Sequence, residues 1–245
     1  MTKLKSKSTI LLLLLLCATL LLNSCYAIAN LREMPDGSLW HKATDSTYIP
    51  CSVSLRAYKL STVFGKNEKG RFYSVKYEEK DRFIAEEDEI GGTVYRHMDV
   101  PEITIENFAA VAAHIYMIGN VRIQLGELLA SPDILGDTSK IVNYQDGTEK
   151  VNAVVDAVSN GERLQYPVNI DEDRVYEIGL LSADFPGLVY TVYFMVDMQG
   201  NAFLNDRATK VVVKCPDIVK KFMLKDSSTE TDTSATESEA DEVSK

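Results

Sequence analysis

The sequence predicts an α+β fold, a single antiparallel sheet-rich domain of about seven to nine strands with two main helices packed on it. Most of the chain reads as short segments in which apolar and polar residues alternate, the period of a half-buried strand. Two longer segments, residues 105–118 and 148–160, carry apolar residues at helical spacing instead. Residues 48–225 have the size of one domain and contain no Pro-, Gly- or Ser-rich linker.

The N-terminal segment has the pattern of a secretory signal peptide. Lys3, Lys5 and Lys7 make its start positive, and a thirteen-residue apolar run, Ile10 to Leu22, follows them. This run is too short to cross a bilayer as a helix, which takes about 20 residues. A basic start before a short apolar run indicates export.

Two cleavage sites follow the apolar run. Leu22-Asn23-Ser24-Cys25 resembles the bacterial lipoprotein box, although Asn23 stands where a small or apolar residue is usual. The resemblance covers only this segment, and it implies that residues 1–24 are removed and that Cys25 is lipidated. Ala27-Ile28-Ala29 matches the rule of ordinary signal peptidase. Because Ser24-Cys25 directly follows the apolar run, we expect a lipid-anchored protein of the cell envelope. Cleavage after Ala29, giving a soluble periplasmic or secreted protein, is the alternative.

The rest of the chain is acidic. The formal charge is −10, and it becomes −13 without the three signal lysines. Residues 226–245 hold seven acids and one lysine among Ser and Thr, so we predict a disordered acidic tail that cannot bury enough surface to fold. The remaining domain carries −7. This charge makes nucleic acid an unfavourable partner, and it disfavours contact between the domain and an anionic membrane.

Two cysteines remain in the predicted domain, Cys51 and Cys215, and each lies beside a proline. In an oxidising compartment, two leftover cysteines suggest a disulfide. The bridge would close a loop of about 165 residues and stabilise the fold by roughly 4–5 kcal/mol in the chain-entropy model. The alternative is two separately buried thiols.

We expect residues 25–47 to be a tether and entry segment with a turn at Pro35-Asp36-Gly37. Strands are predicted across Ile49–Phe64 and Arg71–Tyr77, and they form a hairpin around the polar residues 65–70. Residues 78–89 carry nine charges and are interpreted as a solvated connection. Thr93–Met98 is predicted as a short strand.

Residues 105–118 are predicted as a buried central helix. Thr104 can cap it, and its apolar residues lie nearly all round the helical wheel, which is typical of a helix inside a core. Gly119-Asn120 would end it, and a strand would follow at Val121, Ile123 and Leu125.

The second predicted helix, Thr148 to Asn160, places four valines on one face and ends at Gly161. Five strands are predicted after it: Leu164–Ile170, Val175–Leu181, Leu188–Val196, Ala202–Leu204 and Lys210–Cys215. The strand 188–196 is apolar on both faces, so we expect it to be central and covered on both sides. Asp217–Leu224 is predicted as a short helix that Pro216 opens.

No short motif of catalysis occurs, and we expect no catalytic residue, cofactor or metal site. The three histidines His41, His97 and His114 have no metal-binding spacing, and there is no nucleophile elbow, phosphate loop or dinucleotide fingerprint. The candidates for ligand contact are Trp40, the sole tryptophan, together with Tyr95 and His97 near a strand end.

We therefore expect an envelope lipoprotein that binds or scaffolds an envelope protein partner without catalysis. A second hypothesis is a ligand- or glycan-binding lipoprotein that uses surface tyrosines, because tyrosine combines an apolar ring with a polar tip. A third is an exported hydrolase centred on His97 or a carboxylate.

Overall fold

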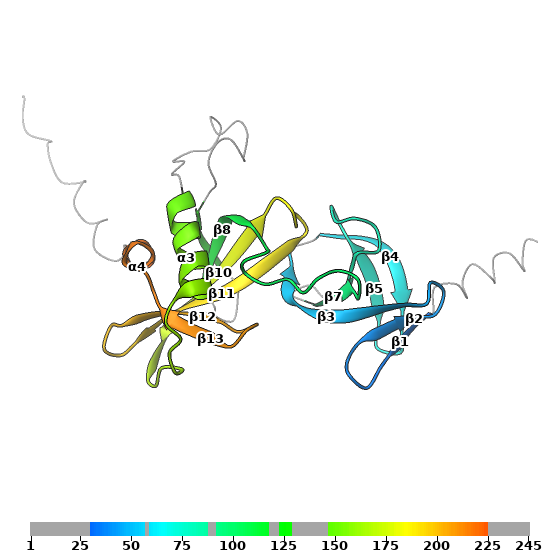
Figure 1. Cartoon of the computed structure of the whole chain (residues 1–245), viewed down its shortest axis with the longest axis horizontal. Helices are drawn as coiled ribbons and strands as arrows, with labels where there is room; N and C mark the ends of the chain where they lie inside the picture. The colour runs from blue at the N-terminus through cyan, green and yellow to red at the C-terminus, as the bar shows by residue number, and fades with distance from the viewer. Residues whose placement is uncertain (1–29, 57–58, 88–91, 118–122, 129–146, 225–245) are drawn as a thin grey trace, which may run out of the picture.

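The computed structural model describes residues 30–56, 59–87, 92–117, 123–128 and 147–224. The predicted signal peptide, Cys25, Ala29 and the acidic tail lie outside these ranges. The described chain is a mostly antiparallel, open sheet with two helices, which confirms a sheet-rich α+β fold (Figure 1). Thirteen strands belong to the sheet in the described ranges, more than the sequence predicted.

Seven strands come from the N-terminal part of the chain. They are β1 (Leu31–Glu33), β2 (Leu39–His41), β3 (Ser46–Leu55), β4 (Leu60–Lys66), β5 (Arg71–Val75), β6 (Phe83–Glu86) and β7 (Thr93–His97). They pair in the order β4-β5-β6-β7-β3, and β2 and β1 continue from β3. The predicted hairpin is present, since β4 pairs with β5 on either side of the 67–70 turn. Residues 30–47, interpreted from the sequence as a tether, thus contain two strands of the sheet.

Six strands follow: β8 (Ala110–Met117), β9 (Ile123–Leu128), β10 (Ile170–Ser182), β11 (Leu188–Asp197), β12 (Ala202–Asp206) and β13 (Val211–Lys214). Strand β11 connects them to the first group. Its start pairs with the end of β3, while its later residues pair with β12, and β10 lies along its other edge. As predicted, β11 is buried on both faces along most of its length.

The predicted helix 105–118 is wrong. Residues 105–109 form turns, with one helical bond from the Phe108 N–H to the Thr104 carbonyl (3.0 Å), and residues 110–117 form β8. Ala109 has a left-handed φ of 51°, which ends the turn. Strand β8 lies between β10 and β9, and Ala112, Ala113 and Ile115 of it are buried. A short apolar run fits a partly covered strand as well as a helix.

The other predicted helices are confirmed as α3 (Thr148–Asn160) and α4 (Asp217–Met223). Helix α3 buries Val151, Val154 and Val158 in the core, and Gly147 rather than a hydroxyl group caps its start. Lys150 Nζ lies 5.7 Å from the centre of the Phe222 ring, which joins α3 to α4. No helix in the described ranges is both long and apolar enough to cross a membrane.

One apolar cluster contains side chains from both strand groups. Val53, Phe83 and Val94 of the first group pack in the same cluster as Val192 and Leu204 of the second. Aromatic rings mark the junction. Phe185 lies between Phe83, at 6.1 Å, and Phe108, at 5.6 Å, and Phe108 also contacts Tyr190 at 5.8 Å.

Strand β6 was missed because residues 78–89 were interpreted as a solvated connection. Phe83, Ile84 and Ala85 are fully buried. Phe83 and Ala85 face the main cluster, and Ile84 faces a smaller one between the first seven strands. Three buried residues inside a charged segment therefore supply a strand that is covered on both faces.

The smaller cluster lies inside the curled N-terminal strands. Its buried members are Leu31, Leu39, Tyr48, Phe72, Ile84 and Tyr95, and Phe64 of β4 packs against it. Phe64 contacts Tyr48 of β3 at 5.2 Å although β4 and β3 are far apart in the strand order. These strands therefore bend around a core of their own.

Cys51 and Cys215 are separate free thiols. Cys51 lies in β3, whose end pairs with Val189 at the start of β11. The Cys215 N–H bonds to Ala202, which pairs with Val196 at the other end of β11. No disulfide joins the two cysteines, although both lie in or against the main apolar cluster. The structure therefore argues against the predicted bridge.

Candidate functional site

The three candidate residues for ligand contact lie in the N-terminal strands, but they do not form one site. Trp40 lies on the outer face of β2, half-buried, and its indole Nε1–H donates to Asp45 Oδ1 at 3.0 Å. Tyr95 and His97 lie on the inner face of β7, the face that carries the smaller cluster. The structure therefore separates Trp40 from the other two.

Tyr95 is buried, at 8 % exposed, and its ring packs against Phe72 at 5.8 Å. Its hydroxyl group donates to Glu86 Oε1 at 3.2 Å. Burial, together with the nearby Glu86 carboxylate, raises the pKa of Tyr95 to about 12. Tyr95 therefore belongs to the core of the curled strands.

His97 lies at the edge of the same core. Its ring meets Tyr48 edge-on at 5.4 Å, and its Nδ1 accepts the Asp99 N–H at 3.3 Å. The side chain is 25 % exposed, while that of Asp99 is 83 % exposed. This histidine and carboxylate thus meet in an open turn, where water surrounds the carboxylate.

His41 belongs to the same group of aromatic rings, which it joins through Phe64, the ring that also contacts Tyr48. It is buried, its ring meets that of Phe64 at 4.6 Å in a tilted arrangement, and its Nδ1 lies 2.7 Å from Thr44 Oγ1. Burial lowers the pKa of His41, with Asp81 acting in the other direction. The neutral imidazole is therefore favoured, as in a structural core histidine.

Within the described ranges, no group of three or more His, Cys, Asp or Glu side chains is placed to hold a metal ion. Burial also raises the pKa of Cys51 to about 11 and that of Cys215 to about 12. A protonated thiol is a poor nucleophile and a poor metal ligand, so neither cysteine is activated for chemistry.

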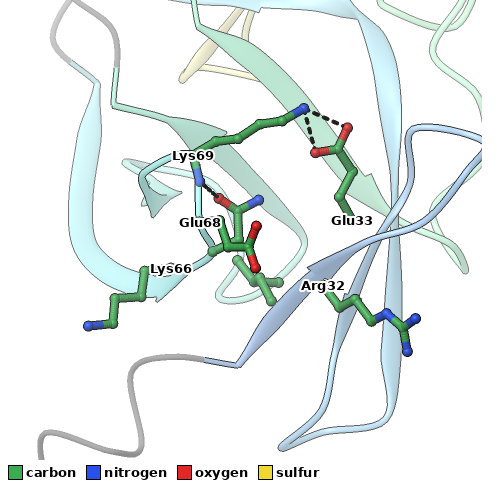
Figure 2. A pocket seen from close by; sticks show the side chains of 7 residues that line it. Arg32, Glu33, Lys66, Glu68 and Lys69 are labelled. Carbon is green, nitrogen blue, oxygen red and sulfur yellow. Dashed lines mark hydrogen bonds and ion pairs between the residues drawn. The ribbon is translucent and has the colours of Figure 1, made fainter.

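An open cavity of about 550 Å³ lies between β1 and the β4–β5 turn (Figure 2). It is lined by Leu31, Arg32, Glu33, Lys66, Asn67, Glu68 and Lys69. Lys69 Nζ lies 2.8 and 2.6 Å from the two carboxylate oxygens of Glu33, and this contact raises the pKa of Lys69. Arg32 and Lys66 point away from the ion pair.

Several exposed apolar side chains also lie close together in sequence, on the segment that leads into β10. Leu164, Tyr166 and Val168 are 36 %, 59 % and 80 % exposed, and Met198 is 67 % exposed. The segment follows the strand edge: the Leu164 N–H bonds to Val212 of β13, and the Met198 N–H bonds to the Asn169 carbonyl. We call Leu164, Tyr166, Val168 and Met198 the apolar strip.

The sequence interpretation placed a strand at Leu164–Ile170 and so missed the strip. Only Ile170 belongs to β10, and residues 164–169 are irregular. Pro167 was the available signal, because proline removes a ladder donor and is confined to strand edges. An alternating apolar pattern around a proline predicts side chains that no neighbouring strand covers.

No protein-family model, curated protein or solved structure matches this chain.

Proposed function

We propose that this protein is a lipid-anchored component of the bacterial cell envelope that holds a protein partner through the apolar strip, without catalysis. Its N-terminal segment supports the anchor, because the basic start, the short apolar run and the Leu22-Asn23-Ser24-Cys25 sequence follow one another in the lipoprotein order. The two strand groups would act as one domain, since a single apolar cluster draws side chains from both.

The apolar strip is the observation that supports partner binding. Among the described residues nine large apolar side chains are exposed, and four of them belong to the strip. Single exposed apolar residues are ordinary on a soluble protein, whereas gathered ones mark an interaction surface. Tyr166 adds an aromatic ring, a residue type enriched at interfaces, and its hydroxyl group is held near Met195 Sδ at 3.4 Å.

The charge beside the strip defines the partner. Asp171, Glu172 and Asp173 follow the strip directly, and Glu172 and Asp173 are exposed. Arg174 approaches Asp171, with Nε 3.9 Å from Oδ2. An apolar centre with an acidic rim complements a protein surface with apolar residues and lysine or arginine at its edge. The partner is therefore expected to carry a basic rim.

Photo-crosslinking in cells tests partner binding. Tyr166 and Tyr77 are both 59 % exposed, so they form a matched pair on two different surfaces. A photoreactive phenylalanine analogue at position 166 should give one discrete adduct, and the same analogue at position 77 should give none. The substitution Val168→Asp should abolish the adduct, because it places a charge in the contact.

Equal adducts from both positions, or an adduct that survives Val168→Asp, would contradict the docking surface. The anchor is tested separately by the intact mass of the detergent-extracted mature protein. A mass that corresponds to Cys25–Lys245 plus acyl chains is expected. A mass that starts at Asn30 without lipid would refute the anchor.

A further inference from the structure

We infer that the partner contributes an extended strand, which pairs with the backbone of residues 162–167 and lays its alternate side chains beside the apolar strip. This inference rests on the docking surface of the proposed function. It adds the secondary structure of the partner at the contact, and it adds backbone hydrogen bonds to a contact that otherwise consists of side chains.

Residues 162–167 form a segment without reversals at the edge of β13. They contain no helix, turn or bend, so the chain continues there without a sharp change of direction. The Leu164 N–H bonds to the Val212 carbonyl at 2.8 Å, and the Asn169 carbonyl accepts the Met198 N–H at 3.0 Å. Asn169 has a left-handed φ of 62°, which turns the chain into β10. The segment is therefore held in place before any partner binds.

One side of this segment carries backbone groups without a hydrogen bond. Within the described part of the chain, the N–H groups of Arg163 and Gln165 have no acceptor, and the Arg163, Gln165 and Pro167 carbonyls have no donor. Successive residues of an extended chain direct these groups to opposite sides. Since the Leu164 N–H faces β13, the Arg163 and Gln165 groups face away from the sheet. Such a row of unpaired groups is a template for a strand of another chain.

The side chains of the apolar strip suit the same occupant. Leu164, Tyr166 and Val168 follow one another at every second position, the spacing at which the side chains of a strand share one face. In strand addition the backbone bonds supply affinity, and the alternate side chains supply specificity. A partner helix would contact the side chains and leave the Arg163 and Gln165 backbone to water. The unpaired backbone therefore favours a strand over a helix.

Pro167 limits the pairing. It lies on the free edge with Arg163 and Gln165, but it has no N–H to donate, so the pairing has a gap at this position. Proline at an edge protects it against unspecific pairing. A second copy of this chain is the poorer occupant, because the gap would then occur in both strands. A strand without proline can still donate to the Pro167 carbonyl. The expected occupant is therefore a segment of a different protein.

A displayed library of short random peptides is the first probe. The library is selected on the full mature protein in detergent and counter-selected on the Val168→Asp variant. Val168 is 80 % exposed, so this variant should fold, which circular dichroism checks. Peptides that bind only the parent should carry apolar residues at alternate positions. Apolar residues spaced three and four positions apart would indicate a helix. That spacing would overturn the strand while the docking surface stands.

Methylation of peptide amides tests the backbone bonds directly. One selected peptide is made in two forms, N-methylated at its odd-numbered or at its even-numbered residues, so that each form blocks one edge of a strand. One form should bind at least about tenfold more weakly than the unmodified peptide, because it loses one or more hydrogen bonds, and the other form should bind nearly as well. Equal binding by the two forms would overturn the strand, because the contact would then not depend on one edge.

Hydrogen exchange locates the pairing on this chain. The Arg163 and Gln165 amides should exchange at least about tenfold more slowly when the unmodified peptide is bound, because they then donate to its backbone. The Glu68 amide is the control. It is exposed and has no acceptor within the described ranges, so its exchange should not change. Unchanged exchange at both Arg163 and Gln165 with the peptide bound would overturn pairing at this edge.

The remaining outcomes separate this inference from the proposed function. If no selected peptide depends on Val168 but the photo-adduct from position 166 still forms, the strand is overturned and the docking surface stands. If the adduct is absent as well, both are overturned. If the parent forms a concentration-dependent dimer in size-exclusion chromatography that Val168→Asp abolishes, the occupant is a second copy, and the strand of a different protein is overturned.

Discussion

The Glu78 carboxylate accepts a 2.9 Å hydrogen bond from the backbone N–H of Gly187, which lies 109 positions later in the chain. Glu78 follows β5, and Gly187 directly precedes β11, so this bond joins the two strand groups at their junction. The Gly187 carbonyl also accepts the Arg56 N–H at 2.9 Å. The N–H and the carbonyl of Gly187 are thus both hydrogen-bonded at the junction between the two sets of strands.

The substitution Gly187→Ala should destabilise the protein by about 1–3 kcal/mol through overpacking. A Cβ atom there would lie 2.5 Å from the Lys76 carbonyl oxygen and 2.6 Å from Val75 Cγ1. Neither a backbone carbonyl nor a buried valine can move aside at low cost. Denaturant unfolding measures the loss. Gly70→Ala is the control, since a Cβ atom added at Gly70 would have no other atom within 4 Å, and it should stay within about 0.5 kcal/mol.

The substitution Glu78→Gln should change how stability depends on pH. Burial raises the pKa of Glu78, while the bond from Gly187 and the charge of Arg82 lower it in part. A raised carboxyl pKa means that the folded state binds the proton more tightly than the unfolded state. This group therefore destabilises the fold at neutral pH. That cost is relieved as the pH falls through the folded pKa toward the ordinary value of 4.5.

Because glutamine is neutral and keeps an oxygen for the Gly187 N–H, the variant should be more stable than the parent at pH 7. This advantage should shrink to nothing below about pH 4, where both states of the parent are protonated. Parallel unfolding curves from pH 4 to pH 8 measure the difference. An advantage that is constant across this range would contradict the raised pKa.

Local patterns predicted β11, β12 and β13 well, because the apolar pattern within a strand indicates which of its faces are covered. Strand β11 is apolar on both faces, which requires cover on both sides, and the Met198–Asn201 turn fixes its pairing with β12. The segment 105–118 fails the same logic. Ala110–Met117 is mostly apolar, and its pairing with β10, some sixty residues later in the chain, is a contact that the local sequence does not show.

The candidate site was less accessible to prediction than the fold. Tyr95 alternates with polar residues, but its neighbour Phe72 is brought to it by the curl of β4–β7 around Tyr48, which no local pattern encodes.

The substitution Tyr190→Phe should destabilise the protein by about 1–3 kcal/mol. The Tyr190 hydroxyl group, in a residue only 1 % exposed, donates to Asp206 Oδ2 at 2.8 Å. Burial and this carboxylate raise the pKa of Tyr190. Asp206 is fully buried and keeps the bond from Thr209 Oγ1 at 2.7 Å, so the variant should still fold.

Tyr193→Phe is the matched control for this prediction. Its ring lies under Arg207, 4.1 Å from the guanidinium carbon to the ring centre, and phenylalanine would preserve that contact. We expect a change within about 0.5 kcal/mol. Equal losses of stability from both substitutions, in thermal or denaturant unfolding, would show that the Tyr190–Asp206 hydrogen bond stabilises the fold no more than the Tyr193 hydroxyl group does.

The mature protein should contain two unpaired thiols, Cys51 and Cys215, that alkylating reagents reach only after unfolding. Their pKa values of about 11 and about 12 lie well above the ordinary value near 8.5, so the thiolate fraction at pH 8 is at least about a hundredfold lower than in a free cysteine. Mass spectrometry without reductant should find two adducts in denaturant and almost none under native conditions. The single variants Cys51→Ser and Cys215→Ser should each lose one adduct. If the parent forms no adduct in denaturant until it is reduced, and each single variant then shows one reactive thiol, the two cysteines are bridged and the prediction of free thiols is wrong.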